Sequence, residues 1–220
     1  MPIPQMDGLK AKLVAYCRFV EGMIEKSRDA LVARQSEIPR EIIDHEEPRA
    51  NEWEMELEEE CTSLIAQHQP MARDLRTILM VLRITNDLER IADHAVNIAE
   101  AVSDHINGSS LSPDDAVLAM FEETIRMVDC AIRAFIGEDA ALGQRVCASD
   151  STVDTLATGI LEKMSTLMTN DPSSVSQNLA LLKIAANLER IADLSTNIGE
   201  DVIYMTEGRV IKHHREEEKR

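Results

Sequence analysis

Oxygen-bearing side chains recur at helical spacing in two stretches of the sequence that lie one hundred residues apart. In the first stretch, Glu89, Asp93, Asn97 and Glu100 follow one another at steps of four, four and three residues. On a helix, these steps place all four side chains on one stripe. The second stretch repeats the same stripe with Glu189, Asp193, Asn197 and Glu200. Carboxylates one turn apart repel by roughly a few tenths of a kcal/mol in an isolated helix, so a stripe that occurs twice favours a bound cation.

A second set of acidic side chains precedes each stripe by about one helix length. Before the second stripe, Asp150 and Asp154 form an acidic pair at one-turn spacing. Before the first stripe, Glu47, Asn51, Glu54 and Glu58 follow one another at steps of four, three and four residues, about one helical turn each. We expect these residues to face the stripes across a shallow groove. Such oxygen ligands suit Mg²⁺, Ca²⁺, Mn²⁺ or iron better than Zn²⁺.

Two other interpretations of the acidic stripes remain open. The first is a structural scaffold that holds no metal, whose acids are a solvated face partly neutralised by Arg90 and Arg190. The second is a metal-dependent hydrolase in which a two-metal centre activates water. The sequence contains no Gly-rich phosphate loop and neither a G-x-S-x-G nor an H-E-x-x-H motif. We therefore expect a protein that is not an enzyme.

The acidic stripes belong to an internal repeat. Residues 79–100 align without a gap to residues 179–200, and twelve of these 22 positions are identical. A repeat of this length indicates a duplicated domain. Turn-forming residues follow residue 106, so we predict one domain over residues 6–107 and a second over residues 112–211.

Three segments with helical periodicity occur in each copy. In the first copy they cover residues 7–34, a segment after residue 39 that ends near 68, and residues 72–106; in the second they cover about 113–136, 139–169 and 174–208. Short turns join them, which is typical of antiparallel bundles. The sequence therefore predicts an all-α fold of two tandem three-helix bundles. Pro48 should kink the second helix, because it removes a backbone hydrogen bond.

Composition limits the partners. The chain carries 40 Asp and Glu against 23 Lys and Arg, a formal net charge of -17, which disfavours nucleic acid. Its four cysteines form no C-x-x-C pair and suggest reduced core residues. No apolar run approaches the roughly 18 residues that a membrane span needs. We expect a cytoplasmic protein that meets membranes only indirectly, through partners.

The sequence resembles the PhoU family of bacterial phosphate-transport accessory and regulatory proteins. The resemblance rests on residues 61–78, 87–100, 148–156, 187–200 and 202–213, and it spans nearly the whole chain. It implies two three-helix bundles and a homodimer. It also implies a negative regulator that couples a phosphate ABC transporter ATPase to a sensor histidine kinase.

The same resemblance implies metal clusters, with Mg, Mn, Fe or Zn as candidate ions, on paired acids one turn apart. Carried onto this chain, the pairs are Glu89 with Asp93, Glu189 with Asp193, Asp150 with Asp154, and Glu47 with Asn51; Asn97 and Asn197 add amide oxygens. Asn51 replaces the second acid of its pair, and Pro48 lies between the two residues. The first-copy site is therefore expected to be weaker or differently shaped.

Overall fold

Helices account for nearly all of the chain that the structure describes. This computed structural model describes residues 5–106 and 112–208, and within those ranges there is no strand. The elements in chain order are α1 (Met6–Ala33), α2 (Glu37–Glu41), η1 (Ile42–Glu46), α3 (Glu47–His68), α4 (Ala72–Ile106), α5 (Asp115–Gly137), α6 (Ala140–Asn170), η2 (Pro172–Ser174) and α7 (Val175–Glu207). The all-α class is confirmed. The domain limits predicted at residues 107 and 211 lie outside the described residues.

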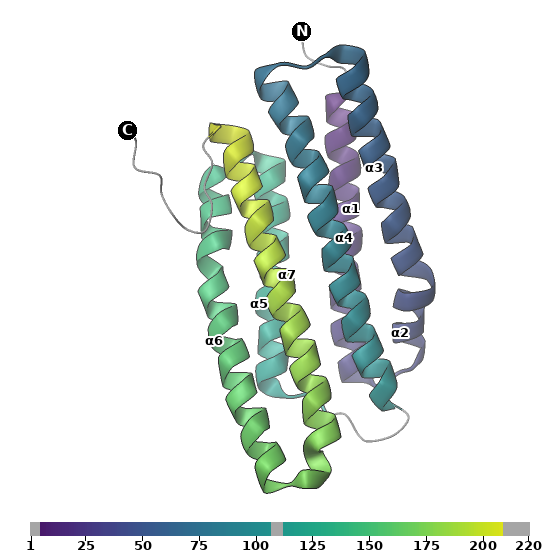
Figure 1. Cartoon of the computed structure of the whole chain (residues 1–220), viewed down its shortest axis with the longest axis vertical. Helices are drawn as coiled ribbons and strands as arrows, with labels where there is room; N and C mark the ends of the chain where they lie inside the picture. Colours follow the sequence, from purple (N-terminus) through teal and green to yellow (C-terminus); the bar gives the residue numbers. More distant parts are fainter. Residues whose placement is uncertain (1–4, 107–111, 209–220) are drawn as a thin grey trace.

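The helices form two three-helix bundles that lie side by side (Figure 1). The first bundle contains α1, α3 and α4, and the second contains α5, α6 and α7. α4 packs against α7 and α1 packs against α5, while α3 and α6 lie at opposite edges of the molecule (Figure 1). The predicted pair of tandem bundles is therefore confirmed. Among the described helices, none combines the length and the apolar character needed to cross a membrane.

The two copies of the repeated helix, α4 and α7, cross each other in opposite directions. Arg83 of α4 lies 2.9 Å from Asp201 of α7, and Lys183, the counterpart of Arg83, lies 4.0 Å from Glu100. Residue numbers rise along one helix as they fall along the other, so the pair is antiparallel, as Figure 1 shows. An approximate two-fold axis therefore relates the two repeated helices.

Apolar side chains of the repeat form the core in both copies. The predicted core positions that are fully buried are Leu88, Ile91, Ile98, Leu188, Ile191 and Ile198. Leu82 and Leu182 are only half-buried and pack at the margin of the core. The buried stripe fixes the rotation of each helix, so the acidic stripe on another side of the same helix must face outward.

Pro48 is accommodated by a change of helical type rather than by an isolated kink. The turn before it, η1, is π-helical, and the Glu47 amide donates to the carbonyl of Ile42, five residues back. In a regular α-helix the Pro48 ring would clash with the carbonyl four residues earlier. The wider turn moves that carbonyl out of register, and Pro48 then occupies the first turn of α3, where no amide donor is required.

Two glycines allow α6 and α7 to approach closely. A Cβ atom added to Gly199 would lie 2.9 Å from the backbone carbonyl oxygen of Gly143, and one added to Gly143 would lie 2.8 Å from the oxygen of Gly199. Each neighbour is backbone, which cannot move aside as a flexible side chain could. Ala99 occupies the equivalent place in the first copy, so this close contact belongs to the second bundle.

The Gly199→Ala substitution is expected to destabilise the second bundle by about 1–3 kcal/mol, because the added methyl group forces α6 and α7 apart. Gly159→Ala is the matched control: Gly159 lies within α6, the helix that α7 contacts at Gly199, and no atom lies within 4 Å of an added Cβ there. That change should stabilise the helix by roughly 0.5–1 kcal/mol. Urea denaturation measures both. Equal effects of the two substitutions would contradict the close packing.

Candidate functional site

Acidic residues of α3 and α4 face each other in the first bundle. Glu47 of α3 is half-buried, and its pKa is raised first by burial and then by the charges of Asp93 and Glu100 on α4. Glu47 therefore lies within electrostatic range of the acidic stripe on α4. Because like charges disfavour the ionised form, this repulsion would be relieved by a cation.

Glu54 lies two helical turns beyond Glu47 on α3 and is also surrounded by acidic residues. Burial raises its pKa first, the charges of Glu58 and Asp93 raise it further, and a hydrogen bond with Asn86 acts in the opposite direction. The pKa of Glu89 is raised by burial, then by Asp93 and Glu54. The carboxylates of Glu54, Glu89 and Asp93, on two neighbouring helices, are thus within electrostatic range of one another. We call these three residues, together with Glu47, the first-half acidic site.

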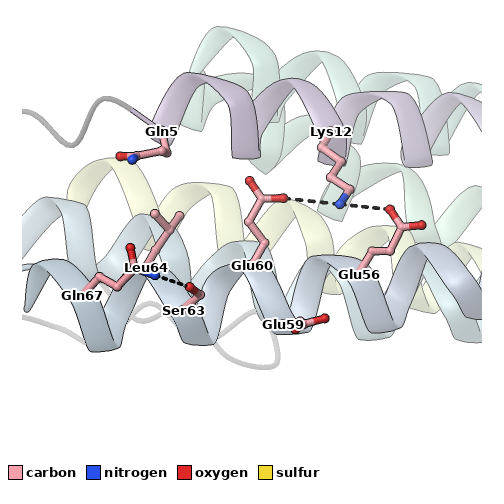
Figure 2. Close-up of a pocket in the computed structure, with 8 residues that line it drawn as sticks. All are labelled: Gln5, Lys12, Glu56, Glu59, Glu60, Ser63, Leu64 and Gln67. Carbon is pink, nitrogen blue, oxygen red and sulfur yellow. Dashed lines mark hydrogen bonds and ion pairs between the residues drawn. The ribbon is translucent and has the colours of Figure 1, made fainter.

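On the opposite side of α3, a lysine side chain lies between two acids and neutralises them. Between α1 and α3 there is a hollow of about 380 Å³ in which Lys12 lies between Glu56 and Glu60 (Figure 2). The Lys12 ammonium is 3.0 Å from Glu56 and 3.3 Å from Glu60. Its hydrogen bond lowers the pKa of Glu56, the reverse of the shift at Glu47 and Glu54. The acidic site on the other side of α3 receives no such lysine among the described contacts.

The buried residues of α3 and α6 define which acids correspond between the two halves. The matching buried positions are Ala50, Leu57 and Leu64 on α3 and Val146, Val153 and Ile160 on α6. In this register Asp150 and Asp154 correspond to Glu54 and Glu58, two helical turns beyond Glu47 and Asn51. The counterparts of Asp150 and Asp154 in the first bundle are therefore Glu54 and Glu58 rather than Glu47 and Asn51. Asn51 itself is exposed.

The second bundle places its predicted residues around a cleft of about 410 Å³ between α4, α6 and α7. Asp150, Asp193, Asn197 and Glu200 line this cleft, as do Arg90, His94 and Arg190. Arg190 lies 3.4 Å from Asp193, so one acid of the cleft is already paired. Four acidic or amide groups and three basic groups therefore meet here, unlike in the first-half acidic site.

Four other predicted residues lie outside this cleft. Asp154 is exposed on α6, one turn beyond Asp150. Glu189 and Asn97 are half-buried on α7 and α4 and do not line the cleft, and Asn51 is exposed on α3. In residues 5–106 and 112–208, no three Asp, Glu, His or Cys side chains already converge as metal ligands. A bound ion would therefore require these surface side chains to rotate.

Polar contacts between the halves involve residues of the same cleft. His94 Nδ1 lies 2.9 Å from Asn187 Oδ1 across the α4–α7 contact. Asn197 is hydrogen bonded to the buried Asp87, and this contact lowers the pKa of Asp87 against a larger effect of burial. Asn197 thus joins the two halves, a role that its place in the acidic stripe did not suggest.

The spacing of the acids predicts the acidic stripes but does not identify every residue of the two sites. Glu54 and Glu100 were recognised as part of the stripes without being chosen as ligands. Asp87 gave no signal beyond its type, since the equivalent position in the second copy is Asn187. Aligning the two second helices by their apolar residues would have identified Glu54, because the spacing of seven residues between buried positions is the same in both.

Comparison with known proteins agrees with the duplicated architecture. The model of the PhoU domain matches residues 13–102 and again residues 117–202. The chain belongs to the PhoU family.

Individual PhoU proteins match over most of their length. The chain is 33% identical to the phosphate-specific transport system accessory protein PhoU homolog 2 of Thermotoga maritima, over 90% of this chain and 84% of that protein. It is 32% identical to the PhoU homolog of Aquifex aeolicus, over 98% of this chain and 97% of the relative. The crystal structure of PhoU from Pseudomonas aeruginosa superposes with a TM-score of 0.88 at 30% identity, covering 93% of this chain and 98% of that one.

Asp87 provides a pH test of the contact between the halves. Burial raises its pKa to about 6, from an ordinary value of 3.8, so the folded protein favours the protonated form. Ionisation therefore removes stability as the pH rises through about 4 to 6, and a shift of about two units corresponds to roughly 3 kcal/mol.

The Asp87→Asn variant cannot ionise at this position and can still accept the hydrogen bond from Asn197. Its free energy of unfolding relative to wild type should therefore increase between pH 4 and pH 7, by up to about 3 kcal/mol. Urea denaturation of both proteins in the presence of a chelator measures this difference, and the other acids cancel because both proteins contain them. A difference that is independent of pH would show that burial does not raise the pKa of Asp87.

Proposed function

We propose that this protein is a cytoplasmic negative regulator of phosphate-starvation signalling and phosphate uptake. In this role it acts as a metal-binding adaptor between the ATPase of a phosphate ABC transporter and a sensor histidine kinase, and it forms the homodimer that the resemblance implies. The proposal is supported by membership of a family whose relatives carry the name of phosphate transport accessory proteins. The structural observation that carries its metal-binding part is the facing of Glu47 and Glu54 with Glu89 and Asp93.

The residues present fit a hard cation. In the first half, Glu54, Glu89 and Asp93 would hold the ion, with Glu47 beside them; all supply carboxylate oxygen, which suits Mg²⁺, Mn²⁺ or iron better than Zn²⁺. A bound cation would offset the repulsion among these carboxylates. The raised pKa values of Glu47, Glu54 and Glu89 support this, because burial first and then neighbouring carboxylates disfavour their ionised forms, with Arg90 partly offsetting the effect at Glu89.

In the second half, Asp150 and Asp193 would hold the ion, with Glu189 and Asp154 at the margin. Asn197 contributes less, since its amide is engaged with Asp87. Arg190 competes for Asp193 at 3.4 Å. We therefore infer that the first half binds a cation more tightly than the second, the opposite of what the replacement at Asn51 indicated.

We propose that the protein is not an enzyme. The one thiol beside the second-half acids is Cys147, and burial together with the charges of Glu200 and Asp150 raises its pKa to about 11. At neutral pH it is therefore protonated and a poor nucleophile. The acidic sites are better suited to joining two helices through an ion, which would present a defined surface to a partner.

Neutralising two acids of the first-half acidic site tests the metal directly. The Glu89→Gln, Asp93→Asn double variant should lose Mn²⁺ binding in the first half, while its stability in chelator stays equal or rises because repulsion is relieved. At a Mn²⁺ concentration one hundred times the dissociation constant, the wild type should gain about 2.7 kcal/mol of unfolding free energy. Elemental analysis and urea denaturation measure both effects.

Glu25→Gln is the control for this experiment, because Glu25 is an exposed acid of α1 on the same bundle. It should change neither the Mn²⁺ content nor the gain in stability. Equal Mn²⁺ binding by the double variant and the control would remove the metal from the proposal and leave a helical adaptor whose acids are solvated.

Removing the gene tests the regulatory role. In phosphate-rich medium, a reporter of the phosphate-starvation response should become active in the deletion strain, and the wild-type chain should restore repression. Glu25→Gln should restore it fully, and the Glu89→Gln, Asp93→Asn variant should restore it less. A reporter that stays silent in the deletion strain would reject the role in phosphate signalling. Co-purification of the transporter ATPase and the sensor kinase, with and without phosphate, then identifies the partners.

A further inference from the structure

Tyr16 of α1 is a fully buried side chain whose hydroxyl has no partner. Its relative exposure is 0%, and its hydroxyl oxygen makes no hydrogen bond with any described residue. Buried tyrosine hydroxyls usually find a partner, because an unsatisfied group costs about 1–3 kcal/mol. The Tyr16 hydroxyl can therefore donate a hydrogen bond to a carboxylate that comes within reach.

The Tyr16 ring is held in place by α3. It stacks on Trp53 with the ring centroids 6.0 Å apart and the planes 14° from parallel. The guanidinium of Arg49 covers Trp53 at 4.7 Å from the ring centroid. A ring clamped in this way cannot swing its hydroxyl toward solvent, so the direction of the hydroxyl is set by the packing of α1 on α3.

Trp53, on which the Tyr16 ring stacks, directly precedes Glu54 of the first-half acidic site in α3. After burial, the charges that raise the pKa of Tyr16 come from Glu54, Glu89, Cys17 and Asp93. The buried hydroxyl is therefore within electrostatic range of acids on both α3 and α4. It stays protonated there, and a protonated hydroxyl can donate a hydrogen bond to a carboxylate.

The second half has no equivalent of this hydroxyl. The buried residues of α1 and α5 match in the order Leu13, Tyr16, Cys17 and Val20 against Val117, Met120, Phe121 and Thr124. Met120 therefore occupies the place of Tyr16, and its thioether donates no hydrogen bond. The hydroxyl is a feature of the first half alone.

We propose that Tyr16 is a positioning residue of the first-half acidic site, whose buried hydroxyl donates a hydrogen bond to a carboxylate that holds a cation and fixes its orientation. The inference rests on the proposed binding of metal. Groups that orient the ligands of a metal commonly contribute ten- to hundred-fold to its affinity. Tyr16 acts through Glu54 or Glu89 and does not contact the ion.

Tyr16→Phe tests this role because it removes one oxygen and keeps the ring that stacks on Trp53. Calorimetry measures the Mn²⁺ affinity of one half at a time. Binding by the first half is measured in an Asp193→Asn background, which disables the second half, and binding by the second half in an Asp93→Asn background, which disables the first. Tyr16→Phe should weaken Mn²⁺ binding by the first half about ten-fold or more and leave the second half unchanged. Met120→Leu, at the equivalent buried position, should leave both affinities unchanged.

Stability in chelator separates positioning from packing. Because the hydroxyl has no partner in the described structure, Tyr16→Phe should be as stable as wild type or more stable when no metal is present. A less stable variant that weakens both halves equally would overturn the proposal. So would a visible tyrosinate-to-iron absorption band in Fe³⁺-loaded protein that Tyr16→Phe abolishes, since the hydroxyl would then be a ligand.

The failure of the inference differs from the failure of the proposed function. If wild-type protein binds no Mn²⁺ in either half, the metal-binding function fails. If the first half binds Mn²⁺ and Tyr16→Phe binds it with the same affinity, the function stands and the positioning role alone is wrong.

Discussion

The antiparallel crossing of α4 and α7 constrains the rest of the molecule. Each of these helices must bury one face in its own bundle, a second face against the other copy, and leave a third for the acidic stripe. Leu88 and Ile98 serve the core, while Arg83 and His94 reach across to the other half. A helix with three assigned faces tolerates little substitution, and this accounts for the close likeness of the two copies over residues 79–100 and 179–200.

The two halves answer the same electrostatic problem in different ways. In the first, burial raises the pKa values of Glu47, Glu54 and Glu89, and neighbouring carboxylates raise them further, although Arg90 partly offsets this at Glu89. In the second, Arg190 lies 3.4 Å from Asp193, which offsets the repulsion there. The two copies have thus kept the same helical framework while their acidic residues differ in how they are neutralised.

Much of the fold could be predicted from the sequence, and the site only in part. Helix count, the duplication and the stripe containing Glu89 and Asp93 are local or periodic features, and these are readable from spacing. The correspondence of Glu54 with Asp150 follows from the seven-residue spacing of the buried positions on α3 and α6, which the sequence also carries. The π-helical turn before Pro48 and the orientation of Tyr16 depend on contacts between helices, so neither could be derived from a single segment.

The raised pKa values also link metal binding to protons. Burial and neighbouring charges make Glu54 and Glu89 take up a proton more readily, so protons would compete with the proposed cation for these carboxylates. Acidification would therefore weaken the binding of a cation at this site. The same crowding of acids that supports the proposed cation site would thus make its occupancy depend on pH, and changing one carboxylate would alter both properties.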